Sequence, residues 1–347
     1  MVSKRKVDCH VLKQKFPFRT AYNELSVGDK KYPVFGVPET DHKRIPLTST
    51  SIAQRNKWFQ QKAMVVDGQR ITKTLPNLNK VEIDNTISPD DVCTGPTLKV
   101  IEFNAERGRL WKEFAPILQG YDVIILNEMD IGMARSDQQH TTRNLARYLG
   151  MNYAWGLEFV ELTVGDANDR EGVVKGAQNV HGLHGSAFLA KCNITNPVVF
   201  RDLNGQYFSD GKVPNIDPSG LEKRLGGRMG MFGRIQVDGQ PVVIGSIHRI
   251  GYGQASRIKK YIKSDPAIVA GDQEGDFCGS IGMQNIISDK NHFTWRASCS
   301  STGFKRGDNI CSNMKFAQED VIMPCVNKFG RELLLSDHSF TWAEFDF

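Results

Sequence analysis

Five polar residues or short polar groups able to do chemistry stand at the ends of apolar runs in this chain. They are Asn104 after residues 98–103, Glu128 after residues 122–127, His248 after residues 242–247, Asp272 after residues 267–271, and the triplet Ser336-Asp337-His338 just ahead of the last run. Because a buried strand fixes its own ends, a side chain there is held with the precision that catalysis needs. The pattern predicts one active site assembled from residues far apart in sequence.

Two of these positions favour a divalent metal. Glu128 is a hard oxygen ligand of the kind that Mg²⁺ or Mn²⁺ prefers, with water and substrate phosphate completing the coordination. Asn104 could complete the site through its carbonyl oxygen or orient a metal-bound water.

The other positions favour proton transfer and phosphate binding. His248 and His338 could bind phosphate oxygens or move protons near neutral pH. Asp272 could align an attacking water, while Asp308 or Asp337 could hold a histidine in one tautomer. A metal, a water-aligning carboxylate and a carboxylate-paired imidazole together predict hydrolysis of a phosphoester.

Each residue alone has a simpler structural explanation. An Asn or Glu after a strand is more often a turn residue, and a single histidine such as His248 is more often structural. The ordered set of five positions, rather than any one of them, supports the catalytic interpretation.

From Pro96 onward, the sequence predicts the alternating helices and strands of an α/β protein, and these elements must position the residues above. Helices are predicted over residues 107–118, 141–149 and 254–263, and strands over 185–190, 232–237, 241–247 and 339–346. Asp238-Gly239 is a strong hairpin turn signal between two of these strands. Strands outnumber helices, and hairpins occur beside helical crossovers, which favours two packed sheets with helices outside. No G-x-G-x-x-G motif follows the first strand, so a dinucleotide-binding fold has little support.

Residues 1–95 differ from the rest and are predicted to form a partly irregular extension, followed by a catalytic domain over residues 96–347. Only about residues 50–66 read as a helix. The extension holds 16 Lys or Arg against 10 Asp or Glu, a net charge of +6, while the rest of the chain carries −1, so the formal net charge of +5 comes from the extension. A basic arm could attract nucleic acid or an anionic membrane, although a solvated extension is the simpler explanation.

Composition places the chain among globular proteins, with 40% hydrophobic and 24% charged residues over 347 positions. No run approaches the roughly 18 apolar residues that a membrane span needs, and the N-terminus has no apolar core typical of a signal peptide. The seven cysteines are scattered without a close C-x-x-C pair, which argues against a zinc site or a disulfide framework. We therefore expect an intracellular protein, cytoplasmic or nuclear.

The ordered motifs resemble those of the endonuclease/exonuclease/phosphatase superfamily, over about residues 98–347. The segments that carry the resemblance are Phe103-Asn104-Ala105-Glu106-Arg107-Gly108, Leu126-Asn127-Glu128-Met129-Asp130, Ile247-His248, Gly271-Asp272, Arg306-Gly307-Asp308 and Ser336-Asp337-His338. The resemblance implies a four-layer α/β sandwich like that of deoxyribonuclease I.

The resemblance also implies roles for the residues that match. Asn104 and Glu128 would hold the metal, His248 would contact the scissile phosphate, Asp272 would orient the attacking water, Asp308 would pair with His338 beside the phosphate, and Asp337 would support the metal side. Arg107 and Arg135 are candidates for contact with anionic substrate, with surface ion pairing as the alternative.

One departure from the family pattern lies after Asp272. The family usually has Gly-Asp-x-Asn, whereas this chain reads Gly271-Asp272-Gln273-Glu274. An ionised glutamate cannot donate a hydrogen bond to the transition state, and losing one such donor costs roughly 10²–10³ in rate. Glu274 therefore either binds a second metal or marks a damaged site. The polar neighbours of Asp308 also depart from the family pattern.

These observations predict a Mg²⁺- or Mn²⁺-dependent phosphoester hydrolase working by in-line attack of water. The basic arm favours a phosphodiester substrate, and hence a DNA or RNA nuclease. The alternatives are a phosphatase or phosphodiesterase acting on inositol phosphates or lipids, and a catalytically impaired binding module with the same fold. The loops over residues 165–182 and 206–227 are expected to set specificity, with basic residues such as Arg224 in the second loop and Arg228 just after it. Substrate identity and oligomeric state are left open.

Overall fold

The computed structural model describes residues 50–60, 74–75, 77–170, 172–201, 222–273, 275–287, 294–295, 298–300 and 307–347. The chain divides into two units, Met1–Lys30 and Lys31–Phe347, and every element described below belongs to the second.

The first sheet has eight strands in the order β1-β4-β5-β3-β2-β16-β13, with β7 paired to β4. Its strands are β1 (Val81–Asp84), β2 (Thr97–Asn104), β3 (Val123–Ile131), β4 (Asn152–Glu161), β5 (Leu183–Ala190), β7 (Arg224–Gly226), β13 (Phe316–Ile322) and β16 (Phe340–Asp346). β2 and β3 are parallel and the remaining pairs are antiparallel, so the sheet is mixed. It includes β1, which precedes the predicted domain boundary at residue 95.

The second sheet has six strands in the order β11-β12-β10-β9-β8-β6. Its strands are β6 (Thr195–Arg201), β8 (Met229–Val237), β9 (Gln240–His248), β10 (Ala267–Asp272), β11 (Gln284–Asn285) and β12 (Asp308–Ser312). β9 and β10 are parallel, and the other pairs are antiparallel. A separate hairpin is formed by β14 (Cys325–Lys328) and β15 (Arg331–Leu334).

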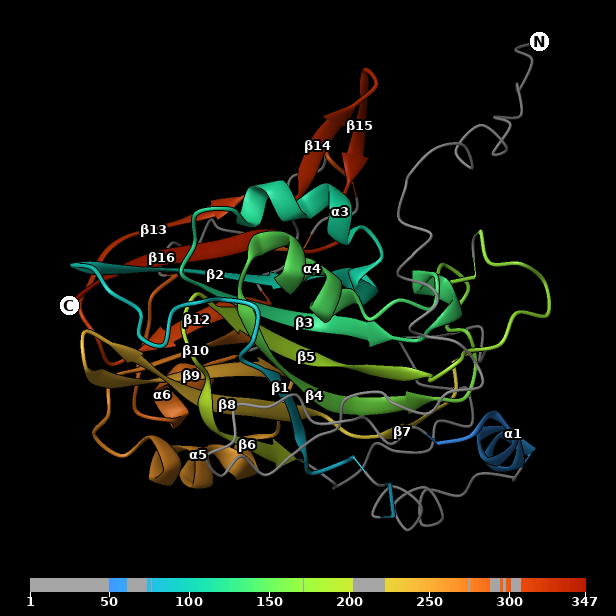
Figure 1. Cartoon of the computed structure of the whole chain (residues 1–347), viewed down its shortest axis with the longest axis horizontal. Coiled ribbons are helices and arrows are strands. Elements are labelled where there is room, and N and C mark those ends of the chain that lie inside the picture. Colours follow the sequence, from blue (N-terminus) through green and yellow to red (C-terminus); the bar gives the residue numbers. More distant parts are fainter. Residues whose placement is uncertain are drawn as a thin grey trace. The chain divides into compact units, whose positions relative to one another are not determined.

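Helices cover the outer faces of both sheets (Figure 1). On the first sheet lie η3 (Glu106–Gly108), α3 (Trp111–Phe114), η4 (Ala115–Leu118), η5 (Ala134–Ser136) and α4 (Thr141–Leu149). On the second lie η6 (Tyr252–Gln254), α5 (Ala255–Ile262) and α6 (Phe277–Ser280), and α1 (Ile52–Gln60) lies near β7. The predicted class, two packed mixed sheets with outer helices, is confirmed.

The apolar faces of the two sheets form one core. Val100 and Ile125 from the first sheet pack in the same cluster as Ile244 and Ile268 from the second, and all four are fully buried. Burying each such side chain contributes about 1.5–3 kcal/mol. The predicted hairpin is present, because β8 and β9 are joined by Asp238-Gly239, both with positive φ as a tight turn of this kind requires.

One predicted helix differs from expectation. The run 107–118 is broken into η3, α3 and η4, because Arg107 and Gly108 take left-handed φ values of 72° and 63° and Pro116 enters the start of η4. By contrast, α4 matches its predicted range, ending at Gly150 in the left-handed conformation. The helix predicted over residues 50–66 is represented by α1, and its remaining residues lie outside the described part of the chain.

The expectation of no disulfide framework is wrong. Three disulfides join Cys93 to Cys192, Cys278 to Cys311 and Cys299 to Cys325. The partners are 99, 33 and 26 residues apart, so sequence spacing gives no sign of the pairing. Since disulfides persist in oxidising environments, the cysteines no longer support a reducing compartment. In the part of the chain described, no helix is long and apolar enough to cross a membrane.

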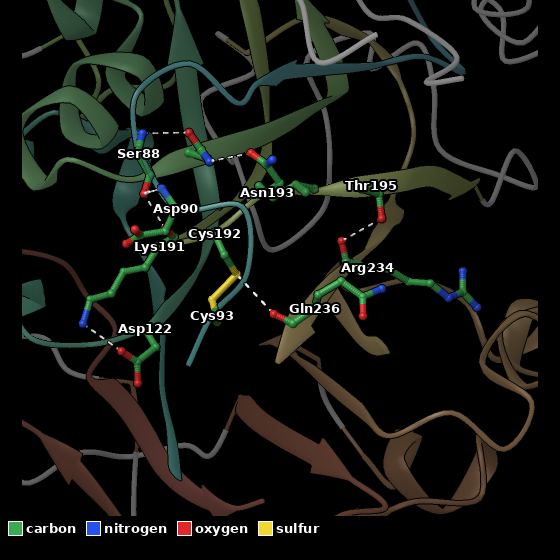
Figure 2. The surroundings of a disulfide bond; sticks show 12 residues. Ser88, Asp90, Cys93, Asp122, Lys191, Cys192, Asn193, Thr195, Arg234 and Gln236 are labelled. Atoms are coloured by element: carbon green, nitrogen blue, oxygen red, sulfur yellow. Dashed lines mark hydrogen bonds and ion pairs between the residues drawn. A yellow bond between two sulfur atoms is a disulfide. The ribbon is translucent and has the colours of Figure 1, made fainter. Parts of the chain in front are cut away.

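The Cys93–Cys192 disulfide ties the segment after β1 to the end of β5 (Figure 2). The backbone of Cys93 also bonds to the end of β8 and to the turn that follows it: Cys93 N donates to Gln236 O at 2.8 Å, and Asp238 N donates to Cys93 O at 3.0 Å. An ion pair of 2.7 Å between Lys191 and Asp122 lies beside it. The disulfide and the backbone bonds of Cys93 together fasten the segment after β1 to both sheets.

Candidate active site

The topology brings the predicted residues to one edge of the two sheets. Asn104 ends β2, while His248 and Asp272 end the parallel strands β9 and β10. β12 runs antiparallel to β10, so its first residue, Asp308, lies directly opposite Asp272. His338 precedes β16, which is antiparallel to β2, so it returns to the end of β2 at Asn104. The directions of the strands therefore explain why these site residues lie close together.

His338 is held in a buried pair with Asp308. The His338 Nδ1 atom lies 2.8 and 3.0 Å from the two carboxylate oxygens, and its Nε2 atom lies 3.5 Å from Asn104 Nδ2. Ser336 fixes the local chain, because its hydroxyl donates to Asn104 O and accepts from His338 N. Burial opposes the charged imidazole, but Asp308, Asp272 and Asp337 raise the pKa of His338 to about 10. His338 is therefore a cation at neutral pH.

His248 is held by a second buried carboxylate, Glu158. The His248 Nδ1 atom lies 2.7 Å from Glu158 Oε2, and Arg228 Nη1 lies 2.8 Å from Glu158 Oε1. Burial would raise the pKa of Glu158, but His248 and Arg228 hold it well below its usual range. The His248 Nε2 atom lies 2.7 Å from Arg228 Nη1, 3.6 Å from Asp272 Oδ2 and 3.7 Å from Glu128 Oε1. His248 thus lies within 4 Å of carboxylate oxygens of Glu158, Asp272 and Glu128.

We expect Glu158→Gln to reduce turnover by roughly 10²-fold through a change at His248, because general acid–base groups contribute about 10²–10⁴ and orientation is part of that contribution. A neutral amide at position 158 would lack the negative charge with which the Glu158 carboxylate binds and orients the His248 imidazole. The steady-state pH–rate profile should change its shape together with the rate. A variant with unchanged pH profile and rate would contradict a positioning role for Glu158.

Asp272 is buried and ionised. Burial would raise its pKa, but the proximity of His248 and the charges of His338 and Arg249 hold the pKa well below its usual range. Asn127, itself held by Ser186 and Ser246, accepts a 2.7 Å bond from Asp272 N. Asp272 Oδ1 has no hydrogen-bond partner among the described residues. This buried carboxylate oxygen therefore keeps its capacity to accept a hydrogen bond.

Glu128 does not follow the end of its strand as predicted. β3 continues to Ile131, and its pairing with β5 shifts register between Leu126 and Met129. Glu128 sits at this bulge with φ of +58°, and a bulge re-aims its side chain toward the site. Asn104 Nδ2 lies 3.4 Å from Glu128 Oε1.

Glu128 and its neighbours are the described residues that could hold a hard divalent cation. No group of three or more His, Cys, Asp or Glu side chains arranged for a metal occurs within the described ranges. Mg²⁺, however, takes one or two carboxylates and completes its shell with water and substrate phosphate. Glu128 is 15% exposed and lies beside an amide, and Asp337 is 59% exposed nearby, with Oδ1 3.9 Å from His338 Nε2. Glu128 and Asn104 would hold the ion, with Asp337 beside them.

The two arginines predicted to contact substrate lie in different surroundings. Arg107 forms an ion pair with Glu128, inside the site. Arg135 has no exposed side-chain surface and is paired with Asp130 and Asp169 at 2.8 and 2.7 Å, so this structure gives it no access to substrate. The prediction for Arg135 is corrected accordingly. Glu274 lies outside the described residues.

Sequence reasoning missed Glu158 as a site residue and did not foresee the contact of Arg228 with His248. Glu158 lies in β4, a strand that is buried throughout its ten residues. The available signal was an acidic residue inside the apolar run 153–160, because a buried carboxylate requires a partner. The basic residue Arg228, expected in a specificity loop, is that partner.

No family model and no curated protein matches the sequence. Solved structures similar to this chain include an endonuclease/exonuclease/phosphatase family protein from Leptotrichia buccalis C-1013-b, at 17% identity and a TM-score of 0.45, covering 72% of this chain and 100% of that one. TDP2 from D. rerio, solved with a single-strand DNA product, is similar at 15% identity and a TM-score of 0.45, covering 73% and 100%. Beta toxin from Staphylococcus aureus is similar at 13% identity and a TM-score of 0.45, covering 71% and 99%.

Proposed function

We propose that this protein hydrolyses a phosphodiester with the help of a divalent metal, by direct attack of water. The observation that carries the proposal is the convergence of two carboxylate-held imidazoles on one ionised aspartate. His338 is held by Asp308 and His248 by Glu158, while Asp272 lies 3.6 Å from His248 and directly opposite Asp308. Such groups around a single phosphorus can align a water, stabilise charge and protonate a leaving oxygen beside a metal.

Each residue has a role that follows from its charge and contacts. Asp272 is ionised and offers a carboxylate oxygen, so it would accept a hydrogen bond from water and align it for attack. His338 is protonated and would stabilise charge on the phosphate or give its proton to the leaving oxygen. His248 would hold a second phosphate oxygen, on the side of the phosphate away from His338. A metal at Glu128 and Asn104 would supply positive charge to the phosphate.

Within this class we favour a nucleic-acid substrate. Support comes from the basic extension, which carries 16 basic and 10 acidic residues over positions 1–95. Lys and Arg attract the phosphate backbone without regard to sequence. Inositol phosphates and lipid headgroups present the same phosphoester chemistry, and they serve as the alternative outcomes of the test.

The test is hydrolysis of bis-p-nitrophenyl phosphate, p-nitrophenyl phosphate, single-stranded DNA and an inositol phosphate with Mg²⁺, Mn²⁺ or EDTA. We expect metal-dependent cleavage of the diester and DNA, abolished by EDTA and by His338→Gln. Preference for the monoester or inositol phosphate would support the phosphatase alternative instead. Folded protein that cleaves none of the four substrates would contradict the proposal.

A further inference from the structure

Arg107 is a largely buried cation that pairs directly with Glu128, a predicted metal ligand. Its guanidinium is only 13% exposed and makes a direct ion pair with Glu128. Both partners have left-handed backbone conformations, with φ of 72° at Arg107 and 58° at Glu128. Such conformations cost free energy in residues other than glycine and persist where the surroundings enforce them. The surrounding fold therefore holds the backbone of both Arg107 and Glu128 in the conformation that brings their side chains together.

Arg107 also has a second set of acidic neighbours. Arg107 Nε lies 3.5 Å from Asp169 Oδ2, and Arg107 Nη2 lies 3.9 Å from Glu222 Oε1. Burial opposes ionisation of both carboxyls, yet arginines, Arg107 among them, hold the pKa of each below its usual value. Both neighbours are therefore anionic and able to hold the guanidinium without Glu128.

We propose that Arg107 is an internal counter-ion of Glu128 that a divalent cation must displace, and that Asp169 and Glu222 retain the displaced guanidinium. The inference rests on the metal site of the proposed function. Two cations cannot share one carboxylate without mutual repulsion, so the arginine and the metal compete for Glu128. The chain thus keeps Glu128 neutralised without metal and lowers the affinity for the ion.

Arg109 provides a matched control for the charge itself. It lies two residues along the chain, and its Nη1 atom lies 3.9 Å from the same Asp169. Its closest ion pair is with Glu106, at 2.6 Å, and no contact with Glu128 is observed among the described residues. Arg109→Gln removes a positive charge from the neighbourhood and leaves the competition at Glu128 in place.

The experiment measures Mn²⁺ affinity by calorimetry and by the electron paramagnetic resonance signal of free Mn²⁺, with no substrate present. We expect Arg107→Gln to bind Mn²⁺ about tenfold or more tightly than the unmodified chain, since the lost repulsion acts at contact distance. Arg107→Lys, which keeps the charge, and Arg109→Gln should each change the affinity much less. Equal or weaker binding by folded Arg107→Gln would overturn the inference while leaving the proposed function intact. Binding by neither protein would instead contradict the metal site itself.

A second measurement follows the guanidinium in the unmodified chain and needs a variant only for assignment. The ¹⁵Nε–H signal of Arg107, assigned by its loss in Arg107→Lys, should shift as diamagnetic Mg²⁺ is added. The signal of Arg109 should shift less. An Arg107 signal that stays unchanged while Mg²⁺ binds would show that the guanidinium does not leave Glu128, and would overturn the inference.

Discussion

Replacing Asp272 by Asn is expected to lower the turnover number for diester hydrolysis by about 10²–10⁴-fold, the range contributed by a positioned acid–base group. The carboxylate is 1% exposed, and its Oδ1 atom has no hydrogen-bond partner within the described part of the chain. An amide has almost the same shape but no negative charge with which to align a water. The measurement is steady-state hydrolysis of bis-p-nitrophenyl phosphate with Mg²⁺, together with thermal unfolding to show that the variant is folded.

The matched control is Asp265→Asn, just before the opposite end of the same strand. Asp265 is 31% exposed and pairs with Arg234 at 3.0 Å, remote from the site at the other end of β10. We expect this variant to keep its turnover number. Equal losses in both variants would mean that β10 had been disturbed generally, and unchanged activity in folded Asp272→Asn would exclude the carboxylate from the chemistry.

Removing the Cys93–Cys192 disulfide is expected to lower the free energy of unfolding by about 2–5 kcal/mol. The partners are 99 residues apart, so the disulfide closes a long loop and restricts the unfolded chain strongly. The variant replaces both cysteines by alanine, and the measurement is equilibrium unfolding in urea. The disulfide also holds the segment after β1 against the β8–β9 hairpin region, so β1 should lose amide protection first.

The comparison for this prediction is the Cys299–Cys325 disulfide, whose partners are only 26 residues apart. Chain entropy makes its removal about 1 kcal/mol less costly, because loop-closure entropy grows with the logarithm of loop length. Equal stability with and without Cys93–Cys192 would show that the unfolded chain is already restricted there by other means.

Much of the site could be predicted because its positions depend on strand direction. Asn104, His248 and Asp272 end apolar runs that do form strands, and those strands end at the same edge. Asp308 and His338 were identified through the motif order, and the structure places them 2.8 Å apart. Local sequence therefore indicated both the elements and the residues they carry.

Other features depend on contacts that local sequence does not record. Glu128 is directed by a bulge whose register is set by β5, far along the chain. Glu158 was missed because its role requires His248, which is 90 residues away, and the sequence of its own strand does not indicate that partner. Arg135 resembled a surface cation, yet Asp130 and Asp169 bury it. The disulfides were missed for the same reason, since pairing follows proximity in the fold.

We propose that one site in this protein directs water onto the phosphorus of a diester with the help of a metal. The most direct measurement is single-turnover hydrolysis of bis-p-nitrophenyl phosphate in H₂¹⁸O with Mg²⁺, followed by mass spectrometry of both products. We predict one ¹⁸O atom in the p-nitrophenyl phosphate and none in the p-nitrophenol, with the reaction lost in EDTA and in Asp272→Asn. Label in the p-nitrophenol, or labelled phosphate formed equally well by Asp272→Asn, would contradict the account.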